Sequence, residues 1–198
     1  FKPIKSVTDG DFIGRRLVTM IQADISYFAM HTNFDAAPGC MADCVAKRLG
    51  IAGGAPLEEM GEEDGIPFGI GKIGPLTEPV TGKALAGKIK ERFGLPFVTV
   101  YGKEMWEEKP VTVAAVCPGS GGSVIQAALD KGAQVLVTGD IGHHEGIDAN
   151  ARGLMIIDAG HYGLEHVFME YMEKYLKDTL GDQVEITTMP VLFPAAVV

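Results

Sequence analysis

The sequence has 198 residues, of which 46% are hydrophobic and 22% charged, a composition that suits one globular α/β domain or two small ones. Its net charge of −9 disfavours binding to nucleic acid, because no cluster of Lys or Arg offsets the acidic residues. Its three cysteines, an odd number, exclude a disulfide framework, and no apolar run approaches the roughly 20 residues of a membrane span, so we expect a cytoplasmic protein without a membrane segment.

The first part of the chain contains helical and strand patterns in alternation. In order, it predicts a helix over residues 12–23, a strand over 25–30, a helix over 41–49 and, from 53 to 65, a loop with a short strand at most. The predicted first strand leads into His31 and Asp35. Cys40 and Cys44 lie four residues apart in the second helix; without a second Cys/His pair, we interpret them as small buried residues. Because the sequence begins with Phe1-Lys2-Pro3 and not with methionine, we expect a fragment that lacks its natural N-terminus.

Residues 69–74 match GxGxxG, the dinucleotide-binding pattern, but Pro75 follows where a helix should begin. We therefore predict a glycine-rich strand that ends in a turn. Thr81 can cap a helix that runs to Phe93, and a strand is expected over 97–101. The charged segment 102–110 predicts a boundary between two domains, at residues 1–105 and 106–198.

The second part predicts a buried, interior strand over 111–116, because its apolar run is continuous. The following Cys117–Ser123 segment is rich in glycine and precedes a helix over 124–129. Such a loop is either a tight turn or a cradle for an anion, and the sequence does not separate the two. A strand over 135–138 and a helix ending near Arg152 follow.

A third buried strand, over 154–157, runs into Asp158, and a long helix is expected from His161. His161 and Glu165 lie one turn apart on that helix and face the same way, so they can bind one metal ion or one ion each of a pair. The alternative is a surface histidine near a favourably placed acidic residue. With a last strand over 184–189, the alternation of strands and helices predicts an α/β fold.

Three predicted strand ends carry clusters of metal-ligand residue types: His31 with Asp35, Asp140 with His143 and His144, and Asp158 with His161 and Glu165. Four of the five histidines lie in these clusters. Imidazoles and carboxylates without thiolates suit Zn, Mn, Fe or Mg with open positions better than a closed structural zinc site. His31 is either a ligand or a residue that orients Asp35, and His166 is interpreted as structural.

These motifs, namely residues 31–39, 69–74, 138–144 and 158–165, resemble the Nif-three-like dinuclear metal-centre family, whose members are GTP cyclohydrolase I type 2 homologues. The resemblance implies two similar α/β domains that face each other across a metal cleft, two divalent ions (Zn, Mn or Fe) and a ring-shaped homohexamer. It places metal ligands on Asp35, His161 and Glu165. It also implies two further ligands from a His-His pair that precedes the segment beginning at Phe1, and it places His143 and His144 along the same cleft.

The leading hypothesis is a metal-dependent hydrolase of a small molecule, and the family resemblance implies that this molecule is the nucleotide GTP. Water would attack C8 of the guanine ring, and His143 or His144 would move protons, because imidazole titrates near neutral pH. One alternative is a regulatory or interaction protein that uses its metal structurally and assembles into a ring. The other is a hydrolase of a phosphoester or of another nucleotide.

Overall fold

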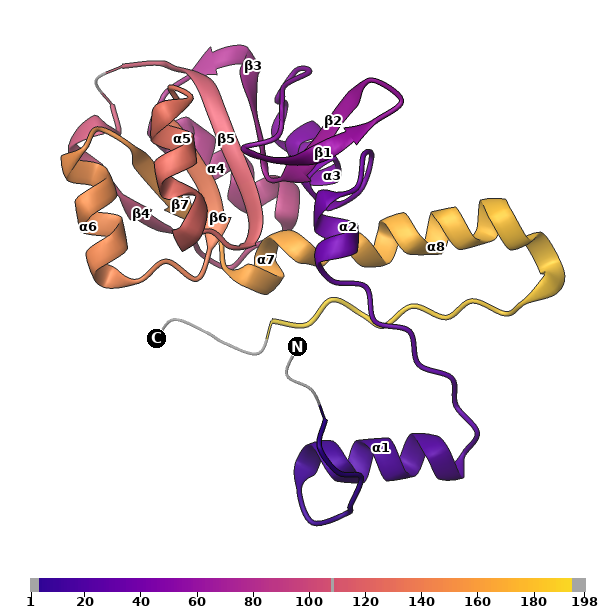
Figure 1. Cartoon of the computed structure of the whole chain (residues 1–198). Coiled ribbons are helices and arrows are strands. Elements are labelled where there is room, and N and C mark those ends of the chain that lie inside the picture. Colours follow the sequence, from indigo (N-terminus) through magenta and orange to yellow (C-terminus); the bar gives the residue numbers. More distant parts are fainter. Residues whose placement is uncertain (1–3, 108, 194–198) are drawn as a thin grey trace. The chain divides into compact units, whose positions relative to one another are not determined.

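The computed structural model describes residues 4–107 and 109–193, so Phe1-Lys2-Pro3 lies outside the described residues. Contacts divide the chain into two compact units, Phe1–His31 and Thr32–Val198. The helices are α1 (Phe12–Gln22), α2 (Thr32–Ala36), α3 (Met41–Leu49), α4 (Gly82–Phe93), α5 (Ile125–Asp130), α6 (His143–Ala151), α7 (His161–Glu165) and α8 (Val167–Leu180) (Figure 1). The strands are β1 (Glu58–Glu63), β2 (Ile66–Ile70), β3 (Lys72–Val80), β4 (Thr99–Tyr101), β5 (Val111–Ser120), β6 (Val135–Gly139) and β7 (Met155–Asp158). Single 3-10 turns lie at Lys103–Met105, Gly122–Val124 and Gly181–Gln183.

The first unit contains α1. Asp11 caps its N-terminus, because the Asp11 side chain accepts a hydrogen bond from the backbone N–H of Gly14 at 2.7 Å. The predicted strand over residues 25–30 is wrong, because the segment is extended but pairs with no other strand. Tyr27 and Phe28 are 74% and 81% exposed. Aromatic and β-branched residues favour strands through the neighbouring strands they pack against, and among the described residues no strand pairs with this segment.

The second unit is built on a mixed five-stranded sheet with the order β3-β5-β6-β7-β4. Strands β5, β6 and β7 are parallel, and β3 and β4 add antiparallel edges. The predicted α/β class is therefore confirmed, with β5 in the interior as expected. The sheet takes β3 and β4 from before the predicted boundary at residue 105 and the other strands from after it. That boundary, and a cleft between two similar domains, stay predictions.

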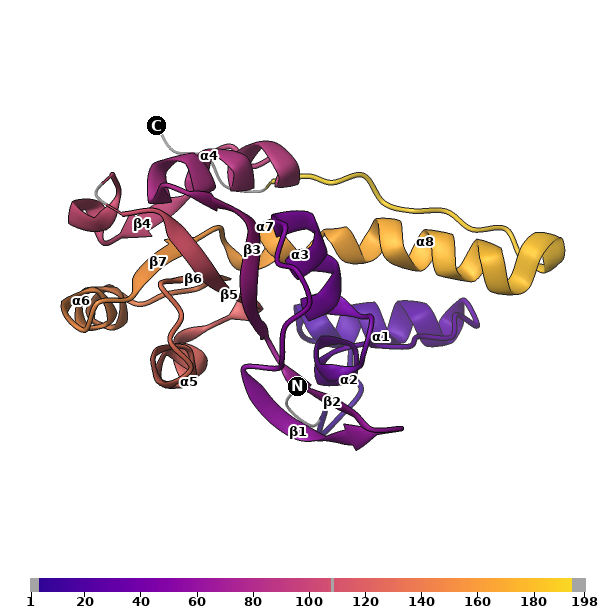
Figure 2. The ribbon, with the colours of Figure 1, turned by 90° about the horizontal axis from the view of Figure 1, so that it is seen from above.

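Helices cover both faces of this sheet: α5 and α6 lie on one side, and α3, α4 and α7 lie on the other (Figure 2). Local signals fix where two of them begin and end. Thr81 Oγ1 accepts a hydrogen bond from Ala84 N at the start of α4, and Gly94 ends it in the left-handed conformation. Gly50 ends α3 in the same way. The largest side chains that the sheet and helices bury completely include Leu57, Leu85, Ile89, Leu136, Leu154, Ile156, Ile157 and Leu164.

The glycine-rich segment forms β2 and β3, with Gly71 between them at a φ of +64°, and β1 pairs with β2 as a hairpin. The predicted glycine-rich strand with a turn is thus confirmed, and no helix follows as a dinucleotide site requires. The single long helix expected from His161 is instead two, α7 and α8, separated at His166.

The predicted strand over residues 184–189 is also wrong: this segment forms no helix or strand, and no strand among residues 4–107 and 109–193 pairs with it. It belongs to a tail that runs back alongside α8 (Figures 1 and 2), and Leu192 N donates to Tyr162 Oη at 3.4 Å near its end. Across the described residues, no helix is both long and apolar enough to cross a membrane.

Candidate metal centre

The predicted site residues of the second unit gather where the parallel strands end. Strands β6 and β7 are in register, with Thr138 opposite Asp158, and Ser120 at the end of β5 lies opposite Gly139. The loops after these strands therefore begin at one edge of the sheet, where open α/β sheets place their sites. Thr138 is fully buried, and its Oγ1 donates to the carbonyl of Cys117 at 2.6 Å, which joins β6 to β5 beneath this edge.

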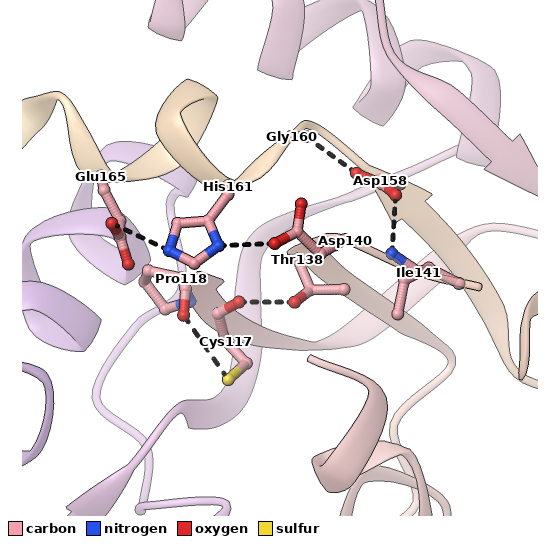
Figure 3. A network of polar contacts seen from close by, with 9 residues as sticks. All are labelled: Cys117, Pro118, Thr138, Asp140, Ile141, Asp158, Gly160, His161 and Glu165. Atoms are coloured by element: carbon pink, nitrogen blue, oxygen red, sulfur yellow. Dashed lines mark hydrogen bonds and ion pairs between the residues drawn. The ribbon is translucent and has the colours of Figure 1, made fainter. Parts of the chain in front are cut away.

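His161 lies at the centre of a polar network that Figure 3 shows. Its Nδ1 is 2.7 Å from Oδ2 of Asp140, and its Nε2 is 3.3 Å from Oε2 of Glu165. The second contact is the one-turn pairing along a helix that the sequence predicts. A neutral imidazole that donates from Nδ1 to Asp140 turns the lone pair of Nε2 toward a carboxylate. Two electron-pair donors at this separation require a cation between them, either a proton or a metal ion.

The electrostatics of His161 point in the same direction. Partial burial lowers the pKa of the imidazole, but the hydrogen bond to Asp140 and the negative charges of Glu165, Asp140 and Asp35 outweigh it, so the pKa is raised overall. Burial, with the charges of Asp35, Glu58 and Glu165, raises the pKa of the Cys117 thiol to about 12. Burial is the larger cause for the thiol, but the negative charges of Asp35 and Glu165 act on both groups, and such charges favour a bound cation.

Asp35 belongs to α2, which the sequence places far from α7. Phe34 is buried, and its ring contacts the rings of Phe168 at 5.1 Å and Tyr171 at 5.3 Å between centroids. This aromatic contact anchors α2 against α8, and Asp35 is the next residue along the chain. The charge of Asp35 consequently acts on His161. The aromatic contact of α2 with α8 thus also brings the first predicted ligand, Asp35, toward the other two.

The donor set suits a divalent ion: one imidazole nitrogen and nearby carboxylates, with Cys117 kept protonated by its high pKa. Among residues 4–107 and 109–193, however, no three or more His, Cys, Asp or Glu side chains are arranged to hold one ion. His161 and Glu165 form the geometric nucleus of the candidate site, and the full ligand set with Asp35 stays a prediction. Cys40 and Cys44 are half-buried free thiols.

His143 and His144 are exposed on the first turn of α6, with ring centroids 5.5 Å apart. They follow the same loop that begins with Asp140, but their proposed part in catalysis stays a prediction. His31 is exposed at the end of the first unit. The structural interpretation of His166 agrees with its hydrogen bond to the carbonyl of Phe93, at 2.9 Å.

The glycine-rich segment after residue 116 resembles a tight turn more than an anion cradle. Strand β5 continues to Ser120, and Gly119 adopts a φ of +82°. A Cβ at Gly119 would lie 2.8 Å from Glu165 Oε1, and one at Gly122 would lie 2.5 Å from Glu145 Oε1. Two carboxylates thus border the segment, and they disfavour a phosphate there. The glycines are needed because acidic side chains fill the adjacent space.

Two residues of this network escaped the sequence-based ligand set. Asp140 holds the imidazole of His161, and the Asp158 carboxylate accepts from Ile141 N at 3.0 Å and Gly160 N at 2.8 Å. The sequence did place both at strand ends, but it grouped them with their chain neighbours. Their true partners lie across two loops, and only the register of β6 and β7 reveals them.

A small cavity of about 110 Å³ opens beside Asp35, between α2, α3 and the β1–β2 hairpin, and Lys72 and Phe68 also line it. Lys72 forms an ion pair with Asp43 at this cavity. A larger hollow of about 660 Å³, lined by Lys83, Val100 and Trp106, contains none of the predicted site residues. Of these two spaces, only the smaller is lined by a predicted metal ligand, Asp35, and neither is lined by His161 or Glu165.

Comparison with known proteins gives consistent matches. The sequence matches the family described as Duf34/NIF3 (NGG1p interacting factor 3) over residues 1–192. It is 35% identical to a GTP cyclohydrolase 1 type 2 homolog of Streptococcus pneumoniae, over 92% of this chain and 67% of that protein. It is 30% identical to Protein NIF3 homolog of Schizosaccharomyces pombe, over 91% of this chain and 62% of that protein.

Solved structures show the same fold. A Bacillus cereus protein related to NIF3 superposes with a TM-score of 0.85 at 21% identity, covering 100% of this chain and 80% of that one. The Staphylococcus aureus hypothetical protein SA1388 superposes with a TM-score of 0.77 at 26% identity, covering 90% and 69%. The chain spans about two thirds of the length of the curated relatives it matches, namely 67%, 65% and 66% for the first three.

Proposed function

The chain belongs to the Duf34/NIF3 family, and we propose that it is a metal-dependent hydrolase whose ions are bound by His161, Glu165 and Asp35. The observation that carries this proposal is the approach of His161 Nε2 to the Glu165 carboxylate, 3.3 Å away, while Nδ1 is already engaged by Asp140. This arrangement presents two bases to one point in space, and a divalent cation satisfies both.

The substrate we propose is a purine nucleotide, with GTP as the first candidate. Support comes from curated relatives that carry the name GTP cyclohydrolase 1 type 2 homolog. A divalent ion, Zn, Mn or Fe, would supply Lewis acidity at this point and allow water to act as a nucleophile near neutral pH. One water would add to C8 of guanine, and the bond between C8 and one ring nitrogen would then break. A second would then hydrolyse the resulting formamide and release formate.

The chain's own residues divide the remaining work. His161 and Glu165 would bind the divalent ion, and Asp140 holds the ring of His161 in place. His143 and His144, exposed on the first turn of α6, would deliver a proton to the departing ring nitrogen, since imidazole exchanges protons near neutral pH. The cavity beside Asp35 offers space for only a small part of a nucleotide, so most of the substrate would lie outside it.

The rival function is an interaction protein with a structural metal. A structural site is closed by protein ligands. A catalytic site keeps an open position, so the number of protein ligands around the ion in the metal-loaded protein would separate the two functions. Assembly as a homohexamer is compatible with either function, and sedimentation of the purified protein would test it.

The test is a screen of the protein, loaded separately with Zn, Mn and Fe, against GTP and other nucleotides. Formate and phosphate release are measured in parallel. We expect formate from GTP without phosphate. Phosphate alone would identify a phosphoester hydrolase, and neither product, from protein that binds metal, would favour the interaction protein.

A further inference from the structure

Asp140 combines an unusual backbone with a directed side chain. It follows β6 directly, and its φ of +54° lies in the left-handed region that residues other than glycine seldom adopt. Gly139 precedes it and Gly142 follows two residues later, so the sequence offers glycine nearby but not at this position. Asp24 and Asp64 also adopt a positive φ, and aspartate does so more readily than most residues, so the backbone alone assigns no task to Asp140. The contact of its side chain is the informative observation. Its Oδ2 lies 2.7 Å from Nδ1 of His161.

A second aspartate fixes the two loops that carry this pair. Asp158, at the end of β7, accepts hydrogen bonds from Ile141 N, next to Asp140, and from Gly160 N, next to His161 (Figure 3). One carboxylate thus holds both loops at the residues that adjoin the pair. Because Asp158 also pairs in register with Thr138 of β6, the distance between the two loops is set by the sheet itself. The approach of Asp140 to His161 is therefore a built feature.

We propose that Asp140 is a positioning residue, which holds His161 as the Nδ1–H tautomer and directs the Nε2 lone pair at the point that Glu165 also faces. This inference rests on the proposed function for its purpose, because a histidine binds metal only through an unprotonated nitrogen. Without Asp140, the Glu165 carboxylate, 3.3 Å from Nε2, remains as an acceptor for the ring proton. The proton would then move to Nε2 and occupy the place of the metal.

The test compares the parent protein with Asp140→Gly, Asp140→Asn and Asp64→Gly. Asp140→Gly removes the carboxylate but keeps a residue that readily adopts a positive φ. The side chain of Asp140 is 55% exposed, so its removal leaves no core cavity. Asp140→Asn keeps an oxygen that can accept the Nδ1 proton. Asp64 lies in the turn between β1 and β2 and has a φ of +52°. Asp64→Gly is the matched control, because it replaces an aspartate of the same backbone conformation outside the His161 network.

The first readout is the tautomer of His161, from the nitrogen chemical shifts of the ring in metal-free, ¹⁵N-histidine-labelled protein. Spectra are recorded at a pH where the ring is neutral, and His161→Gln assigns its signals among the five histidines. We expect Nδ1–H in the parent, in Asp140→Asn and in Asp64→Gly, and Nε2–H in Asp140→Gly. An unchanged tautomer in Asp140→Gly would overturn the inference.

The second readout is affinity for Zn²⁺ and Mn²⁺, by competition with a chelator. Loss of a residue that orients a metal-binding histidine typically weakens binding 10–100-fold, so we expect this loss in Asp140→Gly, substantial recovery in Asp140→Asn and parental affinity in Asp64→Gly. If the parent binds neither ion, the proposed function fails, and the tautomer alone decides the role of Asp140. If the parent binds and Asp140→Gly binds equally well, the metal site stands and Asp140 does not position it.

Discussion

Gly119 lies directly against the side chain of Glu165: a Cβ at this glycine would be 2.8 Å from Glu165 Oε1 and 3.5 Å from His161 Nε2. Its φ of +82° adds a second reason for glycine, because other residues are strained there. The end of β5 thus packs against both predicted metal-binding side chains, Glu165 and His161.

The substitution Gly119→Ala should therefore weaken metal binding without altering any ligand. The new methyl group pushes Glu165 and His161 away from their common point, and we expect at least a tenfold loss of Zn²⁺ affinity. Gly132→Ala is the control, since Gly132 has a φ of +76° with no atom within 4 Å of the added Cβ. Both variants should lose roughly 1 kcal/mol of stability from backbone strain. Equal Zn²⁺ affinity in the two would show that Gly119 does not support the site.

Replacing His161 or Glu165 with alanine should remove metal while leaving the fold intact. Both side chains are partly exposed, at 48% and 30%, so their loss opens no core cavity. The neighbouring Leu164 is fully buried, and Leu164→Ala should cost about 2–5 kcal/mol. Melting in EDTA should find the two ligand variants close to the parent and Leu164→Ala well below it. In excess Zn²⁺ the parent should gain stability by mass action, and the ligand variants should not.

If the ligand variants instead unfold in EDTA while the parent stays folded, the pair is structural. That outcome would mean that the contacts of His161 with Asp140 and Glu165 stabilise the edge of the sheet more than they serve a ligand.

Alanine at His143 and at His144 should separate catalysis from binding. If these exposed residues transfer protons, the double variant should lose about 10²–10⁴ in the rate of formate release. Metal stoichiometry and affinity should match the parent, because the proposed metal-binding residues belong to other elements. Loss of metal from the double variant would reassign the two histidines as ligands.

The buried Cys117 thiol predicts a specific dependence of stability on alkaline pH. Its pKa is raised from the ordinary 9.0 to about 12, mainly by burial. The unfolded thiol ionises above pH 9 while the folded one stays protonated. The associated stability is therefore complete below pH 9 and is lost as pH rises toward 12, by up to about 1.4 kcal/mol per pH unit. Chemical denaturation from pH 8 to 11 should show a steeper decline in the parent than in Cys117→Ala. Parallel curves would show that Cys117 is not buried as described.

Elements with local start and stop signals were predictable from the sequence. Thr81 and Gly94 define α4, and Gly50 ends α3, because a cap acts within one turn of its own helix. The strands over 25–30 and 184–189 were predicted wrongly because composition reports a preference for strands but not the presence of a partner. The separation of α7 from α8 at His166 was missed for a similar reason, because it involves a distant partner. The His166 ring forms a hydrogen bond with the carbonyl of Phe93, which lies 73 residues away in the chain.

Only those parts of the candidate site that lie within one helix or at the end of one strand were predictable from the sequence. The pairing of His161 with Glu165 follows from helical spacing, and the structure places the two side chains together. Three other contacts depend on which strands are neighbours. These are the contact of Asp140 with His161, the hydrogen bonds that Asp158 accepts from two loops, and the packing of Gly119 against Glu165. No spacing within the chain encodes that adjacency, so the contacts of these three residues emerge only from the folded structure.

Anomalous diffraction from crystals soaked with Zn²⁺ or Mn²⁺ would show directly whether His161 and Glu165 bind a divalent ion. We predict an anomalous peak about 2 Å from His161 Nε2 and from a carboxylate oxygen of Glu165, with Asp35 turned toward it. Glu165→Gln crystals, soaked in the same way, should show a weaker peak or none. A parent map with the metal elsewhere, or with no metal between these two side chains, would contradict the account.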